Sequence, residues 1–385
     1  MTVAPSPSAD TSSAVERARG SLWSASITAW ATSHLLMLVT AFYAAHRYGG
    51  SVEQVLSSWD GQWYVRIARH GYPDHVPRVA GHAVQSVIGF FPAYPLSMRA
   101  THVVLPFSLP TVGILVSTAC ALPATHLFGR LVGAWWKPAA ARRATYVFAF
   151  FPGALVLTMV YPEALMLIAA IGCLLLLKEE RWVLAGAAGA VATFTRPNAI
   201  EVWFACAFAC IVAIRSKRDW RSLAAPALAP LGIVGYLAFL WARTGEIGAW
   251  TTVEHDGWHV SNDLGQQYLH RIVDTLSGRS ATADDIVLAI SAVLTIVLLV
   301  WLLRMRPPGL LTVTAVAGTA LLVSDIVGAV PRFVLGVFPL LVPPSVRLRG
   351  KAHVAWVVVS AAAMSLLLLR VYGNYVSGRG ALLTP

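Results

Sequence analysis

The 385-residue chain is 57% hydrophobic and only 12% charged, with a mean hydropathy of +0.65. These values exclude a water-soluble domain with an ordinary polar surface and indicate a membrane protein with several spanning helices. The formal charge of +11 does not indicate nucleic-acid binding, because the basic residues fall mostly in short links between apolar runs. The four cysteines lie within apolar runs, which favours packing over disulfides or a metal site.

The first 20 residues are rich in Ser, Ala, Thr and Pro and predict a disordered cytoplasmic tail. Residues 21–385 are then expected to form a single all-α, polytopic membrane domain. Its apolar runs predict about eleven transmembrane helices, at residues 22–45, 110–132, 142–160, 163–177, 182–195, 198–214, 222–242, 284–303, 309–329, 333–346 and 352–371. Two longer connections, 46–109 and 243–283, are predicted to be outer loops.

The distribution of Lys and Arg predicts the orientation. If the N-terminus is cytoplasmic, every second link lies on the same side of the membrane. Those links contain most of the basic residues, namely Arg17, Arg19, Arg130, Lys137, Arg142, Arg143, Lys178, Arg181, Arg215, Lys217, Arg218, Arg221, Arg304, Arg306, Arg347, Arg349 and Lys351. Because cytoplasmic loops are enriched in positive charge, both long loops are expected to face outward.

The first outer loop contains SSWDGQWYVRIARHGYP, which predicts a short helix with Ser58 as N-cap and Gly71 as its end. Helical spacing gives one face with Asp60, Trp63, Tyr64 and Ile67, and another with Arg66, Arg69 and His70. We therefore expect an amphipathic helix that lies on the bilayer surface. An alternative is that Asp60 only caps this helix and interacts with its dipole.

Four further polar positions gather at the predicted outer ends of spans. Besides Asp60, they are Glu163 in VYPEAL, Arg196 and Asn198 in TFTRPNAI, and Arg332 in VPRFVLG. Charges at the membrane boundary are costly, so each needs a partner or a function. Two structural ion pairs are one interpretation. The other is a site in which a carboxylate acts as a base and the arginines hold a phosphate. Pro197 disfavours helix at Arg196 and is expected to break the chain there.

No sequence pattern indicates a cofactor or a metal. The second outer loop contains Glu246, Glu254, His255, Asp256, His259 and Asp263, but their spacing is not diagnostic of a metal site and favours a solvated loop, with contact to the acceptor as the alternative. The chain has no phosphate-binding GxxxxGK[ST] loop, no GxGxxG after a strand, no HExxH and no GxSxG.

Four parts of the sequence resemble the PIG-V-like mannosyltransferases, a family that includes the GPI mannosyltransferase 2 enzymes and many bacterial relatives. They are WDGQWYVRIARHGY with FFPAYPL, then FFPGALVLTMVYPEAL, RWVLAGAAGAVATFTRPNAI and PRFVLGVFPLL, in the family's order. The chain departs from the eukaryotic pattern at Pro162 and Ala199, where Ser and Gly are common, and this bears on the acceptor more than on the chemistry.

The resemblance implies a GT-C type fold in a bacterial plasma membrane, with an outward-facing site that takes mannose from a polyprenyl-phosphate carrier to a glycolipid acceptor. It makes Asp60 the essential acid, and we expect this residue to be the base of an inverting transfer. The expected substrate-binding residues are Trp59, Trp63, Tyr64, Glu163, Arg196, Asn198 and Arg332. A lipid or sugar transporter or flippase, a protein O-mannosyltransferase and a non-catalytic scaffold remain alternatives.

Overall fold

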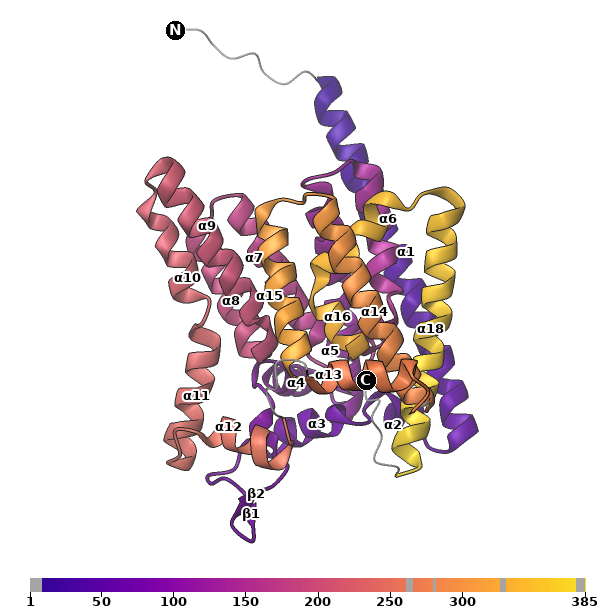
Figure 1. Ribbon diagram of the computed structural model, residues 1–385, viewed down its shortest axis with the longest axis vertical. Coiled ribbons are helices and arrows are strands. Elements are labelled where there is room, and N and C mark those ends of the chain that lie inside the picture. Colours follow the sequence, from indigo (N-terminus) through magenta and orange to yellow (C-terminus); the bar gives the residue numbers. More distant parts are fainter. Residues whose placement is uncertain (1–8, 261–265, 280–281, 326–329, 379–384) are drawn as a thin grey trace.

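A computed structural model describes residues 9–260, 266–279, 282–325, 330–378 and 385 of the chain as a bundle of helices (Figure 1). The longest helices are α1 (Ala9–Tyr48), α5 (Leu109–Gly133), α14 (Ala283–Arg304) and α18 (Gly350–Val376). The others in the bundle are α6 (Pro138–Ala149), α7 (Glu163–Lys178), α8 (Trp182–Thr195), α9 (Glu201–Lys217), α10 (Ala224–Leu228), α11 (Leu231–Thr244), α15 (Gly309–Asp325), α16 (Val330–Gly336) and α17 (Val342–Arg347).

Shorter elements connect these helices. They are the helices α2 (Val52–Leu56), α3 (Asp60–His70), α4 (Ala93–Val104), α12 (Ala249–Thr252) and α13 (Gln266–Leu276), the 3-10 helices η1 (Val87–Gly89), η2 (Pro152–Leu157), η3 (Pro197–Ile200), η4 (Trp220–Leu223) and η6 (Phe338–Leu341), and the π-helical turn η5 (Val253–Gly257). The strands β1 (Arg78–Val79) and β2 (His82–Ala83) form an antiparallel hairpin. Its turn residues Ala80 and Gly81 both have positive φ, as a tight hairpin turn requires.

Fewer helices qualify as membrane spans than the eleven expected. Among the described residues, five helices are long and apolar enough, at Gly20–Tyr48, Leu109–Gly133, Pro197–Lys217, Ala283–Arg304 and Gly350–Val376. A sixth results if Trp220–Leu228 and Leu231–Thr244, which meet at an angle of 41°, form one bent span. The described chain is therefore a multi-pass membrane protein, but the predicted number of eleven spans is not confirmed. Residues 1–8 of the predicted tail lie outside the described residues, and α1 already begins at Ala9.

Besides the bent span, two other predicted spans are broken in the structure. Residues 142–160 divide into α6 and η2, and residues 333–346 divide into α16, η6 and α17. Prolines stand at each break, including Pro152 and Pro339, and proline cannot donate the backbone hydrogen bond that a continuous helix needs. Both breaks are buried, and Phe151 and Phe338 belong to the main hydrophobic core. Irregular backbone is tolerated at this depth where protein surrounds it.

The basic links and the first long loop lie at opposite ends of the bundle (Figure 1). The connections α5 to α6, α7 to α8 and α14 to α15 lie at the end where the N-terminal part of α1 lies. Helix α3 and the β1–β2 hairpin lie at the other end. The depth of the bundle therefore separates α3 from the positively charged links.

Helix α3 differs from the prediction at its start and agrees with it at its end. Ser58 is not the N-cap, because its hydroxyl donates to the Val55 carbonyl at 2.8 Å at the end of α2. Trp59 takes the N-cap position instead. Gly71 ends the helix as predicted, with φ of +74° and its N–H donating to Ile67. Tyr64 and Ile67 are buried, and the side chains of Arg66, Arg69 and His70 are exposed. The position of this helix in a membrane surface remains a prediction.

Gly153 in η2 allows α16 to approach this buried turn. A Cβ atom at Gly153 would overlap the carbonyl oxygen of Pro331, and would lie 2.6 Å from the Pro331 carbonyl carbon and 3.1 Å from Cα of Arg332. Because these neighbours are backbone atoms, they cannot rotate away as a flexible side chain would. Gly153 is therefore required for Arg332 to occupy its place.

We expect Gly153→Ala to reduce the free energy of unfolding by about 1 to 3 kcal/mol, the usual cost of forcing extra volume into a packed core. Gly172→Ala in α7 is the matched control, because a Cβ at Gly172 meets no atom within 4 Å. Thermal unfolding of both variants in detergent measures the difference. Equal melting temperatures for the two variants would show that the contact between η2 and α16 tolerates a methyl group.

Candidate active site

Asp60 is the first residue of α3, and an unusual turn places it there. The preceding Trp59 has φ of +58°, a left-handed conformation that is uncommon for a residue other than glycine. The indole N–H of Trp59 donates to the Val371 carbonyl in α18 at 3.1 Å, and its ring lies 5.7 Å from that of Tyr375. These contacts hold the turn, and the turn fixes the point at which Asp60 begins the helix.

Glu163 and Arg196 come from two other breaks in the helices. Glu163 is the first residue of α7 and follows Pro162. Helix α8 ends at Thr195, and Arg196 is extended, with φ of −154° and ψ of 144°. The prediction that Pro197 would prevent helix at Arg196 is therefore confirmed. Each side chain is thus positioned by the end of a helix, where proline ends or begins the hydrogen-bonded backbone.

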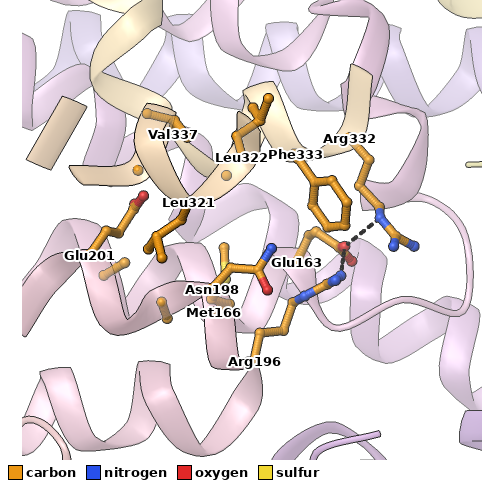
Figure 2. A pocket seen from close by; sticks show the side chains of 14 residues that line it. Glu163, Met166, Arg196, Asn198, Glu201, Leu321, Leu322, Arg332, Phe333 and Val337 are labelled. Atoms are coloured by element: carbon orange, nitrogen blue, oxygen red, sulfur yellow. Dashed lines mark hydrogen bonds and ion pairs between the residues drawn. The ribbon is translucent and has the colours of Figure 1, made fainter. Parts of the chain in front are cut away.

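Asp60, Arg332, Glu163 and Arg196 form a row of alternating charge, which we call the charge chain. Nη1 of Arg332 donates to Oδ2 of Asp60 at 2.7 Å. Nε of Arg332 lies 3.3 Å from Oε1 of Glu163, which also accepts from Nη1 of Arg196. Figure 2 shows Glu163 between the two guanidinium groups. Two carboxylates and two guanidiniums give the row a formal charge of zero.

Asp60 is the member of the charge chain that a second molecule reaches most easily. Its side chain is 27% exposed, compared with 11% for Arg196, 6% for Arg332 and 2% for Glu163. Oδ2 of Asp60 is taken by Arg332, whereas Oδ1 has no hydrogen-bond partner among the described residues. Asp60 therefore presents one carboxylate oxygen at the open end of an otherwise buried, neutral cluster.

Two aromatic residues that sequence reasoning missed surround the charge chain. The Phe333 ring lies 4.9 Å from the Arg332 guanidinium carbon and 5.4 Å from that of Arg196. The Tyr161 ring lies 5.2 Å from the guanidinium carbon of Arg332, and its hydroxyl accepts from the backbone N–H of Asp60 at 3.2 Å. Such ring faces stabilise a guanidinium that has lost water. Both could have been found from their positions in the sequence, because Tyr161 lies two residues before Glu163 and Phe333 directly follows Arg332.

The predicted substrate-binding aromatics of α3 are engaged in packing. Trp63 stacks on Phe90, with ring centroids 5.9 Å apart, and meets the Trp258 ring at 5.3 Å. Tyr64 is buried and contacts the rings of Phe90 and Tyr94 edge to face. Burial raises the pKa of the Tyr64 hydroxyl above its ordinary value. These contacts give Tyr64 a place in the core, and its role toward a substrate remains a prediction.

A cavity of about 20 Å³, with room for about one water molecule, continues from the charge chain toward Asn198 and Glu201. Asn198 lies between Glu163 and Glu201 in Figure 2. Glu201 is buried, and Gly318 in α15 leaves space for its carboxylate, since a Cβ atom at Gly318 would overlap Oε2. Sequence reasoning did not select Glu201, although a single acid in an apolar run was a usable signal.

The site offers groups for substrate hydroxyls but no set of metal ligands. Oε2 of Glu163 is buried and has no hydrogen-bond partner among the described residues. Nε of Arg332 is similarly buried, and although it lies within ion-pair distance of Glu163 it is not aligned for a hydrogen bond. Buried polar atoms of this kind are costly unless a bound molecule satisfies them. In the described part of the chain, no three His, Cys, Asp or Glu side chains are grouped to hold a metal ion.

The chain matches the model of a known family. The model of glycosyltransferase family 87 matches residues 90–324, which is more than half of the chain. This stretch contains Glu163, Arg196 and Asn198, whereas Asp60 precedes it and Arg332 follows it. No curated protein matches the chain.

Replacing Glu163 by Gln is expected to destabilise the protein by about 3 to 5 kcal/mol, because it leaves two buried guanidiniums with one carboxylate. Glu180→Gln is the control, since Glu180 pairs with Lys217 while 49% exposed, and its loss should cost about 1 kcal/mol or less. Denaturant unfolding in micelles measures both. Adding Arg196→Gln to Glu163→Gln should restore part of the stability, and a lack of any coupling would contradict the charge chain.

Proposed function

The chain belongs to glycosyltransferase family 87 and is a multi-pass membrane protein, and from these premises we propose that it transfers mannose from a polyprenyl-phosphate carrier to a glycolipid acceptor. Family membership implies glycosyl transfer. A membrane glycosyltransferase is expected to use lipid-linked donor and acceptor. The choice of mannose rests on the resemblance of four sequence segments to the PIG-V-like mannosyltransferases.

The observation that carries the proposal is the partly exposed carboxylate of Asp60 at the end of the charge chain. In the proposed reaction this carboxylate takes the proton from the attacking hydroxyl of the acceptor. The hydroxyl oxygen forms a bond to the anomeric carbon as the bond from that carbon to the phosphate oxygen breaks. The phosphate leaves with the electron pair as polyprenyl phosphate. A single displacement of this kind inverts the anomeric configuration.

Arg332 has two roles in this proposal. Its Nη1 holds Asp60, so it positions the base, and its Nη2 has no hydrogen-bond partner among the described residues. That donor is the group left to bind an oxygen of the departing phosphate. Arg196 lies farther along the row and is paired with Glu163. In the proposal its main role is therefore to neutralise the charge of Glu163, and binding the donor is a lesser role.

The proposed site faces away from the cytoplasm. The short links rich in Lys and Arg lie at one end of the bundle, and α3 lies at the other (Figure 1). Cytoplasmic loops of membrane proteins carry an excess of positive charge. This asymmetry supports an Asp60 that meets its substrates on the outer side, where the first long loop covers the end of the bundle.

Asp60→Asn is expected to reduce turnover by about 10² to 10⁴, the usual contribution of a positioned general base, because the amide cannot take the hydroxyl proton. Purified protein in lipid, given polyprenyl-phosphate mannose and a glycolipid extract, allows this to be measured as radiolabelled product. Asp74→Asn is the matched control, since Asp74 is an exposed acid in the same loop that pairs with His75 at 2.8 Å.

The control is expected to retain the activity of the unmodified protein. Near-normal transfer by Asp60→Asn would remove Asp60 from the role of base. If transfer depends on Asp60 but uses another sugar carrier, the role of Asp60 as base would stand and the assignment of polyprenyl-phosphate mannose as donor would be wrong.

A further inference from the structure

A second cavity, of about 520 Å³, lies at the far end of α3 from Asp60. Its lining includes His70, Tyr72, Arg99, Tyr236, Phe239 and Arg243. The lining comes from the end of α3 and the two residues that follow it, from Pro92 and α4, and from α11, with one residue of α8. The volume is within the range of about 300 to 1,000 Å³ that is usual for ligand sites.

The charges of this cavity are all positive. The two charged side chains are those of Arg99 and Arg243, which line it beside His70, and within the described residues no Asp or Glu does. Arg99 forms no ion pair in the described part of the chain. Arg243 donates from Nη2 to the Tyr72 carbonyl at 3.2 Å and forms no ion pair in the described part of the chain, although the exposed carboxylate of Asp74 is near enough to interact with it. Two guanidiniums and an imidazole around one opening form an arrangement that suits a phosphate group.

The walls of the cavity are apolar and firmly held. The Tyr236 hydroxyl donates to the carbonyls of Ile88 and Phe90 at 2.8 and 3.0 Å, and the Tyr72 hydroxyl donates to Phe90 at 2.7 Å. Two apolar side chains of the lining remain open to the surroundings, Leu96 at 51% and Phe239 at 43% exposure. Exposed apolar side chains beside a positively charged opening match a ligand with a charged head and a hydrocarbon chain.

We propose that this cavity binds the phosphate headgroup and adjoining chain of an anionic glycerophospholipid, as a second lipid site beside the active site. The conclusion that the sugar donor does not occupy this cavity rests on the proposed function. The donor phosphate is bonded to the carbon that the acceptor hydroxyl attacks, and Asp60 must contact that hydroxyl. Ten residues of helix separate Asp60 from His70, or about 15 Å, which is too far for the donor phosphate.

The test measures binding of phosphatidylglycerol to the full chain in neutral detergent by native mass spectrometry. The test variant is Arg99→Gln with Arg243→Gln. The matched control is Arg66→Gln with Arg69→Gln, which removes the same charge from exposed positions of α3 that do not line the cavity. We expect the test variant to bind about tenfold more weakly or worse, and the control to bind as the unmodified protein does.

Two further arms complete the test. Phosphatidylcholine, which has no net charge, is expected to bind weakly, and polyprenyl phosphate is expected not to displace bound phosphatidylglycerol. Equal loss of binding in both double variants, or displacement by polyprenyl phosphate, would overturn the proposal. Binding needs no turnover, so Asp60→Asn should bind phosphatidylglycerol normally, and failure of the catalytic proposal is recognised separately by its transfer assay.

Discussion

The charge chain is the interaction on which the rest of the site depends. Two guanidiniums and two carboxylates alternate from Asp60 to Arg196, so no member of the row is buried without a partner of opposite charge. A single buried charge is expensive in a membrane protein, and removing one member of a buried pair leaves its partner uncompensated. Neutrality therefore explains how four charges persist among apolar helices, while Asp60 alone remains partly open to a substrate.

The backbone supplies the geometry through breaks in its helices. Asp60 and Glu163 begin helices, Arg196 occupies an extended residue between two of them, and Arg332 lies on the short helix α16. A continuous span would place these side chains at different depths, whereas helix ends bring them to one level. Gly153 provides the close approach between η2 and α16 that this requires, and the surrounding core keeps the irregular backbone away from lipid.

The sequence predicted the parts of this structure that local rules decide. Gly71 ends α3, and Pro197 keeps Arg196 extended. The four charged residues, which were predicted to lie at the outer ends of spans, are in contact with one another. It could not reveal that Trp59 adopts a positive φ, because contacts with α18 hold that turn. The eleven spans expected from hydropathy are not confirmed, since hydropathy does not distinguish residues that are apolar because lipid surrounds them from residues that are apolar because protein does. The order of pairing within the charge chain depends on tertiary packing, which no local pattern encodes.

Exchanging the partners of the outer ion pair separates the structural role of Asp60 from its chemical role. The doubly substituted protein Asp60→Arg with Arg332→Asp retains one positive and one negative charge at the open end of the row. Its thermal stability and its glycosyl transfer are measured beside those of the two single variants. If Asp60 is the base, the exchange recovers much of the stability lost in each single variant but none of the transfer. Recovery of transfer together with stability would show that Asp60 serves only as the partner of Arg332.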